Sequence, residues 1–265
     1  MTLPTLYIPH GGGPCFFMDT PPGWPRDLWD KMASYLRGIA GALGARPKAV
    51  LVVSAHWEEA VPTVNVATNP PLLFDYYGFP EHTYRLTYPA HGSPEVAARV
   101  RALLATAGIE SAEESERGLD HGVFVPFKLV YPDADVPVVQ LSLKEGLDPK
   151  MHLAIGRALA PLRDEGVLIV GSGMSYHNLR EFFDGSTSRL AAEFDRWLGE
   201  AVSDAAARDA KLASWREAPG ALACHPRSEH LLPLMVAAGA ARGDPGRRTY
   251  GEPLMGKAIS GFQFG

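Results

Sequence analysis

The imidazole side chains offer the most chemistry in this sequence, because imidazole binds divalent metals and transfers protons near neutral pH. Three of the nine histidines follow apolar runs that are typical of buried strands, namely His10 in IPHGGGP, His56 in SAHWEE and His177 in GSGMSYHNLR. Ligands of an open α/β sheet bind beyond the carboxyl ends of the strands, where residues far apart in sequence meet. The sequence therefore predicts that these three imidazoles lie close together.

Two further histidines, His121 in GLDHGVF and His230 in HPRSEHLLP, stand beside glycine, proline or cap-like residues at predicted element boundaries. A catalytic metal site takes about three protein ligands and keeps positions open, while a neighbouring base transfers protons. His10, His56 and a third group from the Glu229-His230 pair fit that count. The other two of these five histidines are then left for acid/base work.

Three more histidines are interpreted as ordinary polar residues. His152 falls within a helical pattern, so we expect it on the surface of that helix. His82 and His91 lie on a segment rich in aromatic residues and at most contact a substrate.

The HGGGP run that begins at His10 is similar to three known loops. The Walker pattern needs GxxxxGK[ST], and the Rossmann pattern would need a glycine where Phe16 stands, so phosphate binding is not predicted. An HGGG oxyanion hole of the esterase type needs a GxSxG nucleophile elbow, whereas Ser172 in GSGMS lies at a different spacing. We interpret the glycines as a tight turn after the strand, which lets His10 face the site.

Composition favours a small molecule or another protein as partner. The 265 residues are 46% hydrophobic, which suffices for one large α/β domain or two small ones. With 21% charged residues and a net charge of -5, the chain is not expected to bind nucleic acid or an anionic membrane. No secretory signal and no stretch of ~20 apolar residues is evident, so we expect a soluble, cytoplasmic protein.

The chain has two cysteines, Cys15 and Cys224, which are too few for a disulfide scaffold. The oligomeric state stays open.

Apolar runs rich in β-branched residues alternate with segments of helical periodicity. Strands are predicted over residues 6–9, 49–55, 136–143 and 167–173, and helices over 93–108, 148–166, 188–215 (one or two) and a segment after Pro226. Continuous apolar runs are typical of strands buried on both faces, as in parallel sheets. We therefore predict an α/β fold, a single domain over residues 1–265 whose central, mostly parallel sheet is flanked by helices.

The segment 68–94 is long for a connection and rich in proline and aromatic residues. Connections longer than ~12 to 15 residues without regular structure are usually functional. We expect this segment to form a lid or a pocket wall, with Tyr76, Tyr77 and Phe79 as candidates for contacting a substrate.

Five segments occur in the order of a known family: IPHGGGP, VVSAHWEE, LDHGVFVPFKLVYPDADVPVVQLSL, GSGMSYHNLR and HPRSEHLLPLMVAAGA. From about residue 6 to residue 240 the chain resembles the class III extradiol ring-cleaving dioxygenases, in the single-chain DOPA 4,5-dioxygenase-like branch of the LigB family. Each motif alone is only weakly specific for the family, but five motifs in the same order and with similar spacing make the resemblance specific. The resemblance implies one LigB-like catalytic domain that opens the ring of a small aromatic diol with O2 to give a semialdehyde.

The resemblance also implies a ligand set for a non-haem metal. His10 and His56 match the first two ligands, and His230 matches the third. Two-chain members of the class use two histidines and one glutamate, so Glu229 could take the third position instead. Adjacent residues of a helix point roughly 100° apart, so we expect only one of this pair to face the metal, and the branch motif favours His230.

Two histidines are implied for proton transfer. His177 matches a family residue that is either a further ligand or the base, and His121 matches one that contacts substrate or oxygen. Fe(II) is the expected cofactor for activity, while an all-histidine set also suits Zn(II), which has no redox chemistry. Two alternatives therefore stay open: a zinc-dependent hydrolase on the same histidines, and a metal-binding protein without catalysis.

Overall fold

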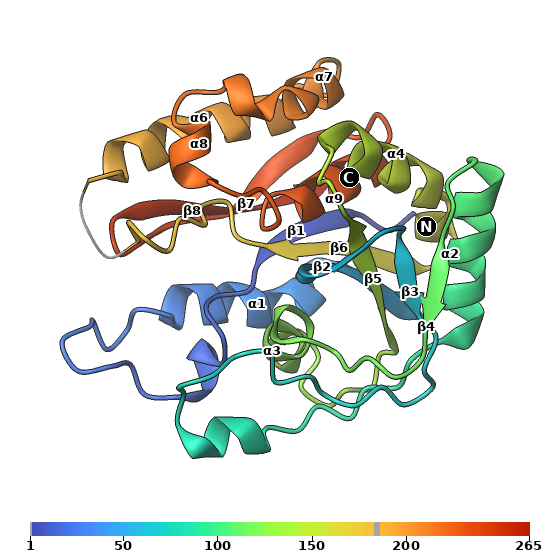
Figure 1. Ribbon diagram of the computed structural model, residues 1–265, viewed down its shortest axis with the longest axis horizontal. Helices are drawn as coiled ribbons and strands as arrows, with labels where there is room; N and C mark the ends of the chain where they lie inside the picture. Colours follow the sequence, from blue (N-terminus) through green and yellow to red (C-terminus); the bar gives the residue numbers. More distant parts are fainter. Residues whose placement is uncertain (1, 183–185) are drawn as a thin grey trace.

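The computed structural model describes residues 2–182 and 186–265, whose strands join one eight-stranded sheet in the order β4-β3-β5-β2-β6-β1-β8-β7 (Figure 1). The strand bounds are β1 Thr5–Pro9, β2 Ala49–Glu59, β3 Thr63–Asn65, β4 Ala112–Glu114, β5 Val138–Lys144, β6 Val167–Gly173, β7 Gly246–Leu254 and β8 Lys257–Phe264. Four neighbouring strands, β5, β2, β6 and β1, run parallel and carry the apolar runs from which strands were predicted. Both faces of these strands are buried, which explains their continuous apolar character.

Antiparallel strands complete the sheet on both sides of this parallel centre. β8 pairs with β1 and β7 with β8 at one edge, and β3 pairs with β5 at the other. The β7–β8 hairpin turns at Met255 and Gly256, whose φ angles of 49° and 80° are those of a two-residue hairpin loop. The predicted single α/β domain with a mostly parallel sheet is thus confirmed, and its C-terminal antiparallel hairpin is an addition.

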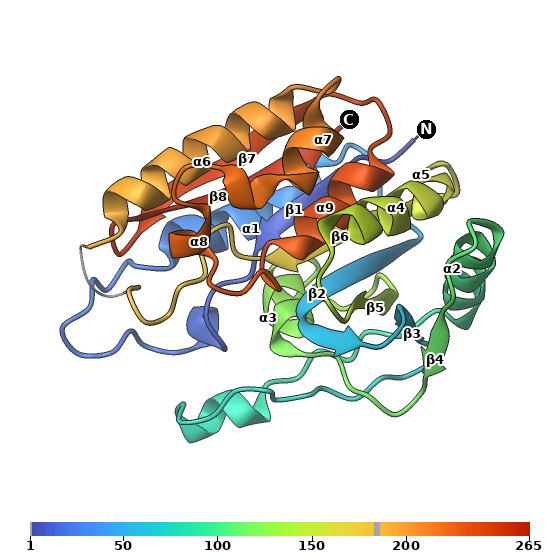
Figure 2. The same ribbon diagram turned by 45° about the horizontal axis from the view of Figure 1, so that its top comes forward.

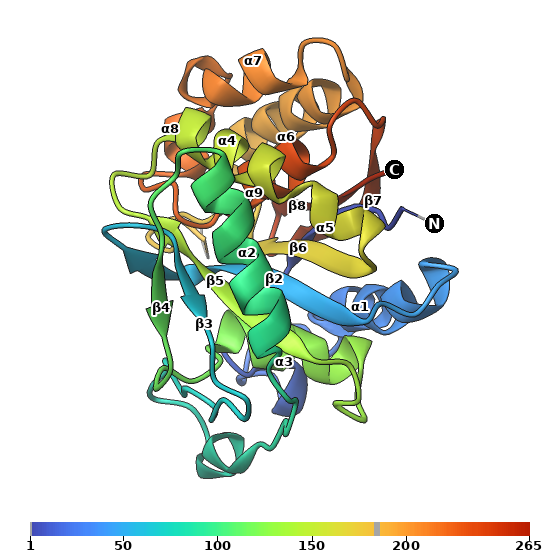
Figure 3. The same cartoon turned by 90° about the vertical axis from the view of Figure 1, so that its right-hand side faces the viewer.

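Helices cover both faces of the sheet (Figures 1 and 3). The α-helix bounds are α1 Asp30–Ala42, α2 Pro94–Thr106, α3 His121–Val130, α4 Pro149–Leu159, α5 Pro161–Asp164, α6 Ser188–Ser203, α7 Arg208–Ala213, α8 Ala221–Cys224 and α9 Leu232–Ala240, and the 3-10 turns are η1 Cys15–Phe17, η2 Glu81–Arg85 and η3 Trp215–Glu217. α1 and α3 pack together on one face, while α4 and α9 pack together on the other. α6 contacts β7 and β8, and α7 contacts α4 and α9.

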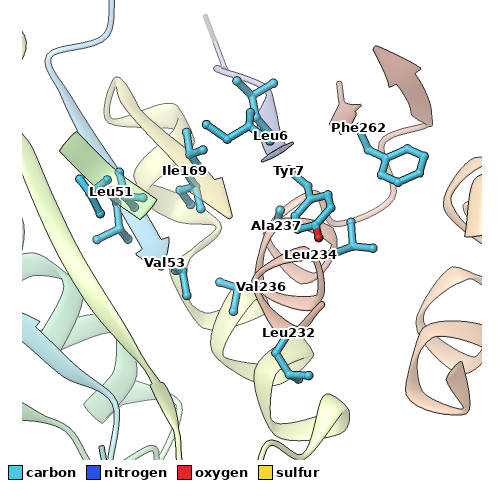
Figure 4. Packing of buried hydrophobic residues seen from close by; sticks show 14 of the residues in the cluster. Leu6, Tyr7, Leu51, Val53, Ile169, Leu232, Leu234, Val236, Ala237 and Phe262 are labelled. Atoms are coloured by element: carbon cyan, nitrogen blue, oxygen red, sulfur yellow. The ribbon is translucent and has the colours of Figure 1, made fainter. Parts of the chain in front are cut away.

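The core lies between the parallel strands and α9, whose residues are all buried (Figures 2 and 4). Side chains of β1, β2, β6 and α9 gather there in one cluster. Because α9 lies against β1 and β6, the turn that precedes it comes to the carboxyl ends of these strands.

Two expectations about helices need correction. The predicted helix over 148–166 is divided at Ala160 into α4 and α5, because Pro161 begins a new helix. His152 is fully buried instead of lying on the helix surface. Its Nδ1 donates to the carbonyl of Asp148 (2.7 Å) and its Nε2 accepts from the amide of Lys144 (3.1 Å), so it ties α4 to the end of β5. Across the described ranges, no helix is both long and apolar enough to cross a membrane.

Candidate metal centre and substrate cavity

His10 enters the site directly after β1. Its amide donates to the carbonyl of Gly173 at 3.2 Å, which keeps the backbone beside the end of β6. The chain then turns through Gly11 and Gly13, whose φ angles of +79° and +54° favour glycine. Gly12 has no positive φ, so two positions of the glycine run favour glycine by their backbone conformation and one does not. This turn keeps the His10 ring fully buried beyond the carboxyl end of β1.

The protonation of His10 follows from its partner. Ser172 Oγ lies 3.0 Å from His10 Nδ1, and the same hydroxyl donates its single hydrogen to the carbonyl of Gly122. The hydroxyl can therefore only accept from His10, which places the ring hydrogen on Nδ1 and a lone pair on Nε2. That Nε2 lies 3.2 Å from Nε2 of His56. Two imidazole nitrogens so close can bind one cation together.

His56 lies within β2 and not at its end, because the strand continues to Glu59 beyond a register shift between Val53 and Glu58. Burial, followed by the neighbouring His121, lowers the pKa of His56 to about 3. Burial likewise lowers the pKa of His10 well below its usual range, and neighbouring imidazoles add to this effect. Both rings are thus neutral at pH 7, the form that binds a metal.

His121 is the first residue of α3 and is held by Asp75 from the long aromatic segment. One carboxylate oxygen of Asp75 accepts from both the amide and Nδ1 of His121, each at 2.8 Å. The second oxygen lies 3.7 Å from Nδ1 of His56. Burial alone would raise the pKa of Asp75, but the hydrogen bonds from His121 have the larger, opposite effect. The pKa is therefore below its usual value, and the carboxylate stays charged.

His230 lies in the turn before α9, not on a helix as expected for the Glu229-His230 pair. Its carbonyl accepts from the hydroxyl of Tyr7 at 2.8 Å and from the amide of Met174 at 3.2 Å. A Cβ at Gly173 would overlap this carbonyl, so only glycine allows the turn to lie so close to β6. Burial, then the neighbouring His177, lowers the pKa of His230 well below its usual range.

Glu229 joins two imidazoles through one oxygen. Its Oε1 lies 2.9 Å from Nδ1 of His230 and 3.0 Å from Nδ1 of His177. The His177 ring stacks on that of His230, with 3.3 Å between centroids, and its amide donates to the carbonyl of Cys224 at 2.9 Å. Burial raises the pKa of Glu229, but the hydrogen bond from His177 contributes to a net lowering. The carboxylate therefore serves as an acceptor for two rings.

The structure brings all five predicted histidines together. By ligand-atom separation they form two groups within the described residues, His10 with His56 and His121, and His177 with Glu229 and His230. The second group adjoins the first, since the ring of His230 lies 5.2 Å from that of His10 and 4.8 Å from that of His56. In four of the five rings Nδ1 faces an acceptor, which leaves Nε2 as the ligand atom. These rings are those of His10, His121, His177 and His230. Metal-binding histidines are held in this way, so the donor set fits a divalent cation.

These histidines form the floor of a cavity of about 340 Å³. Of the three aromatic candidates, Phe79 lines the cavity, whereas Tyr77 does not and its side chain is 91% exposed. Tyr76 is buried behind the wall, where its hydroxyl donates to the carbonyl of Thr83 at 2.8 Å. His82 and His91 are both exposed on the same segment.

Sequence reasoning missed two kinds of residues. Asp75 and Ser172 orient imidazoles, but an isolated acid on a loop and a serine in a strand carry no sequence signal for that role. Trp24 and Trp29 line the cavity from an irregular segment between η1 and α1, which no periodicity marks. The tryptophans could have been suspected only from their large apolar side chains in a segment without regular structure.

The fold and the imidazole cluster define an α/β protein with a candidate metal centre beneath an apolar cavity. Residues 4–262 match the family described as the catalytic LigB subunit of aromatic ring-opening dioxygenase, and the chain belongs to this family. The resemblance read from the five motifs is thus confirmed.

Individual relatives agree with this assignment. The chain is 45% identical to a 4,5-DOPA dioxygenase extradiol from Beta vulgaris over 199 residues, and this aligned stretch covers 74% of each chain. It is 38% identical to dioxygenase tasH from Hapsidospora irregularis, over 99% of this chain and 85% of that one. The crystal structure of an uncharacterized protein from Escherichia coli K12 superposes with a TM-score of 0.80 at 30% identity, covering 99% of this chain and all of the other.

Proposed function

We propose that this protein is an extradiol dioxygenase that opens the ring of a catechol with O2 and yields a semialdehyde. The observation that carries the proposal is the convergence of imidazoles with free Nε2 atoms on the floor of an apolar cavity. A site of this kind can bind a metal on one side and an aromatic ring on the other. Family membership supplies the reaction class.

His10, His56 and His230 are the proposed ligands, and Fe(II) is the proposed cofactor. Bound there, Fe(II) would supply the redox chemistry that Zn(II) lacks, binding the diol and activating O2. Glu229 is not needed as third ligand, because its Oε1 already accepts from His230 and His177. An acceptor at Nδ1 fixes the orientation of a ligating imidazole and raises its basicity.

His177 is the proposed base. Its Nδ1 donates to Glu229, so its Nε2 can accept a proton from a hydroxyl of the diol. The carboxylate of Glu229 stabilises the imidazolium that this transfer creates. Stacking on His230 keeps the ring of His177 next to the proposed ligands.

His121 is the proposed second acid/base group. The charged Asp75 holds its Nδ1, which leaves Nε2 directed to the same cavity as that of His177. The two groups thus sit on different elements and each has its own carboxylate. Apolar side chains line the cavity beside them and limit the access of water, which strengthens the hydrogen bonds of both rings to their carboxylates.

The test is anaerobic reconstitution with Fe(II), followed by oxygen uptake and near-visible absorbance with a panel of catechols. We expect uptake of one O2 per diol and a new semialdehyde absorbance, and neither with Zn(II). His177→Ala and His121→Ala should abolish most turnover. No uptake with any catechol, together with hydrolysis of an ester or amide by the Zn(II) form, would establish the hydrolase instead. Metal binding without either activity would leave a metal-binding protein.

A further inference from the structure

We infer that the substrate is a catechol whose ring substituent is uncharged and apolar, an alkyl or aryl group. This inference rests on the proposed dioxygenase function and adds the chemical class of the group that the cavity accepts. It is carried by the wall of the cavity, by its size and by the positions of the surrounding charges.

The wall above the histidines comes from four separate parts of the chain. Its main apolar side chains are Trp24, Leu28, Trp29, Phe79, Phe182 and Leu254. Among the described residues that line the cavity, none is a lysine, arginine, aspartate or glutamate. A substituent that extends away from the floor therefore meets hydrocarbon and indole surface.

Three charged groups beside the histidines, those of Asp75, Glu229 and Arg227, are engaged with other residues. The carboxylates of Asp75 and Glu229 accept hydrogen bonds from imidazoles and do not line the cavity. Arg227 extends away to Glu58 at 2.6 Å and to Glu229 at 3.4 Å. The contacts of these three side chains hold them away from a substituent in the cavity.

The ammonium group of Lys257 lies behind an aromatic ring of the cavity wall. It is fully buried, donates to Thr187 Oγ1 at 2.8 Å and lies 5.7 Å from the ring centroid of Tyr176. Tyr176 lines the cavity, whereas Lys257 does not. A carboxylate in the cavity would meet the ring and not the ammonium group.

The volume fits a ring and a substituent of similar size. A cavity of roughly 150 Å³ holds benzene. The cavity here has about 340 Å³, more than twice that volume. A catechol at the histidine floor thus leaves space for a short alkyl chain or a second ring.

A charged substituent would lose its water without gaining a partner. Transfer of an unpaired carboxylate or ammonium group into apolar surroundings is far less favourable than transfer of a methyl group. DOPA carries both charges, although relatives of this chain are named for it. We therefore expect a preference of at least about 100-fold for neutral catechols over acids of the same length.

The experiment compares catechols that differ only in charge. 4-Propylcatechol, 3-(3,4-dihydroxyphenyl)propanoate, its methyl ester, dopamine and DOPA are assayed by oxygen uptake with the Fe(II) enzyme. Binding of the same compounds to the metal-free protein is measured by titration calorimetry, which needs no turnover. Both kcat/KM and affinity should rank the propyl compound and the ester well above the acid, the amine and DOPA.

A variant pair tests whether the wall sets this ranking. Leu179 lines the cavity and is 63% exposed at its mouth, so Leu179→Arg adds a cation there without burying it. We expect the ratio of kcat/KM for the acid to that for its ester to rise at least 5-fold. Leu222 is 55% exposed and does not line the cavity, so Leu222→Arg should leave the ratio unchanged.

The outcomes separate this inference from the proposed function. Efficient oxidation of DOPA or the acid, at least equal to that of the ester, would overturn the inference and leave the dioxygenase proposal intact. Preferential binding of neutral catechols without oxygen uptake would support the inference about the cavity and contradict the dioxygenase. Equal binding of all five compounds, or no binding of the neutral ones, would overturn the inference.

Discussion

Ser172 Oγ lies 3.0 Å from Nδ1 of His10 and decides which ring nitrogen carries the hydrogen. Its own hydrogen goes to the carbonyl of Gly122, so the hydroxyl accepts from Nδ1 and leaves Nε2 free. Ser172→Ala removes this acceptor, and the His10 ring can then carry its hydrogen on Nε2. We expect the affinity for Zn(II) or Fe(II) to fall 10- to 100-fold, as measured by chelator competition under anaerobic conditions.

Ser142 provides the control for this exchange. It is equally buried, on β5, which β2 separates from the strand of Ser172. Its hydroxyl accepts from the amide of Thr63 at 2.9 Å and contacts none of the five histidines. Ser142→Ala should lower stability by about 1 kcal/mol and leave metal affinity unchanged. Equal losses of metal affinity in both variants would contradict the role assigned to Ser172.

Asp75→Asn tests whether His121 transfers protons or is a metal ligand beside His10 and His56. The asparagine keeps an oxygen acceptor but loses the charge that holds Nδ1 of His121. If His121 transfers protons and does not bind the metal, kcat should fall 10- to 100-fold while metal affinity changes less than 3-fold. Glu81→Gln serves as control, because Glu81 lies on the same segment with an 86% exposed side chain. A 10-fold loss of metal affinity would instead place His121 among the ligands beside His10 and His56.

The glycine run after His10 predicts a graded effect on stability. Gly11 and Gly13 have positive φ, and an added Cβ would meet Cys15 Sγ in one case and the Phe79 ring at 2.9 Å in the other. Gly11→Ala and Gly13→Ala should each lower the free energy of unfolding by about 2 kcal/mol in urea denaturation. Gly12→Ala should change it by less than about 0.5 kcal/mol, because its Cβ would find only Trp29 at 3.9 Å. Equal losses at all three positions would show that φ does not decide the outcome.

The parallel centre of the sheet could be predicted from sequence because strands buried on both faces must be apolar throughout. The hairpin of β7 and β8 could not, since β7 is buried only at intervals and carries arginines and a proline. The convergence of His10, His56 and His177 could be predicted because each follows the apolar run of a parallel strand. The orienting roles of Asp75 and Ser172 depend on contacts between segments distant in sequence. His152 was misplaced because a periodic pattern cannot show that a histidine has partners for both ring nitrogens.

His225 predicts a loss of stability in mild acid. Its Nε2 donates to the carbonyl of Ser175 at 2.9 Å, and its buried Nδ1 has no hydrogen-bond partner among the described residues. Burial lowers the pKa of His225 to about 4. The unfolded chain binds this proton near pH 6.5, so between these values it binds more protons than the folded one. The free energy of unfolding is therefore not reduced by His225 above pH 6.5, and it falls as the pH falls from 6.5 toward 4.

Urea denaturation at pH 7.5 and 5.0 measures the loss of stability that His225 causes. His225→Gln keeps an amide hydrogen for Ser175 but cannot titrate, so its stability should fall by about 2 kcal/mol less than that of the wild type over this interval. Phe194 packs on the same ring, with 5.6 Å between centroids. Phe194→Leu should therefore lower stability by about 1 kcal/mol at both pH values and keep the wild-type pH dependence. The same pH dependence in His225→Gln and the wild type would show that His225 is not the group that loses its proton on folding.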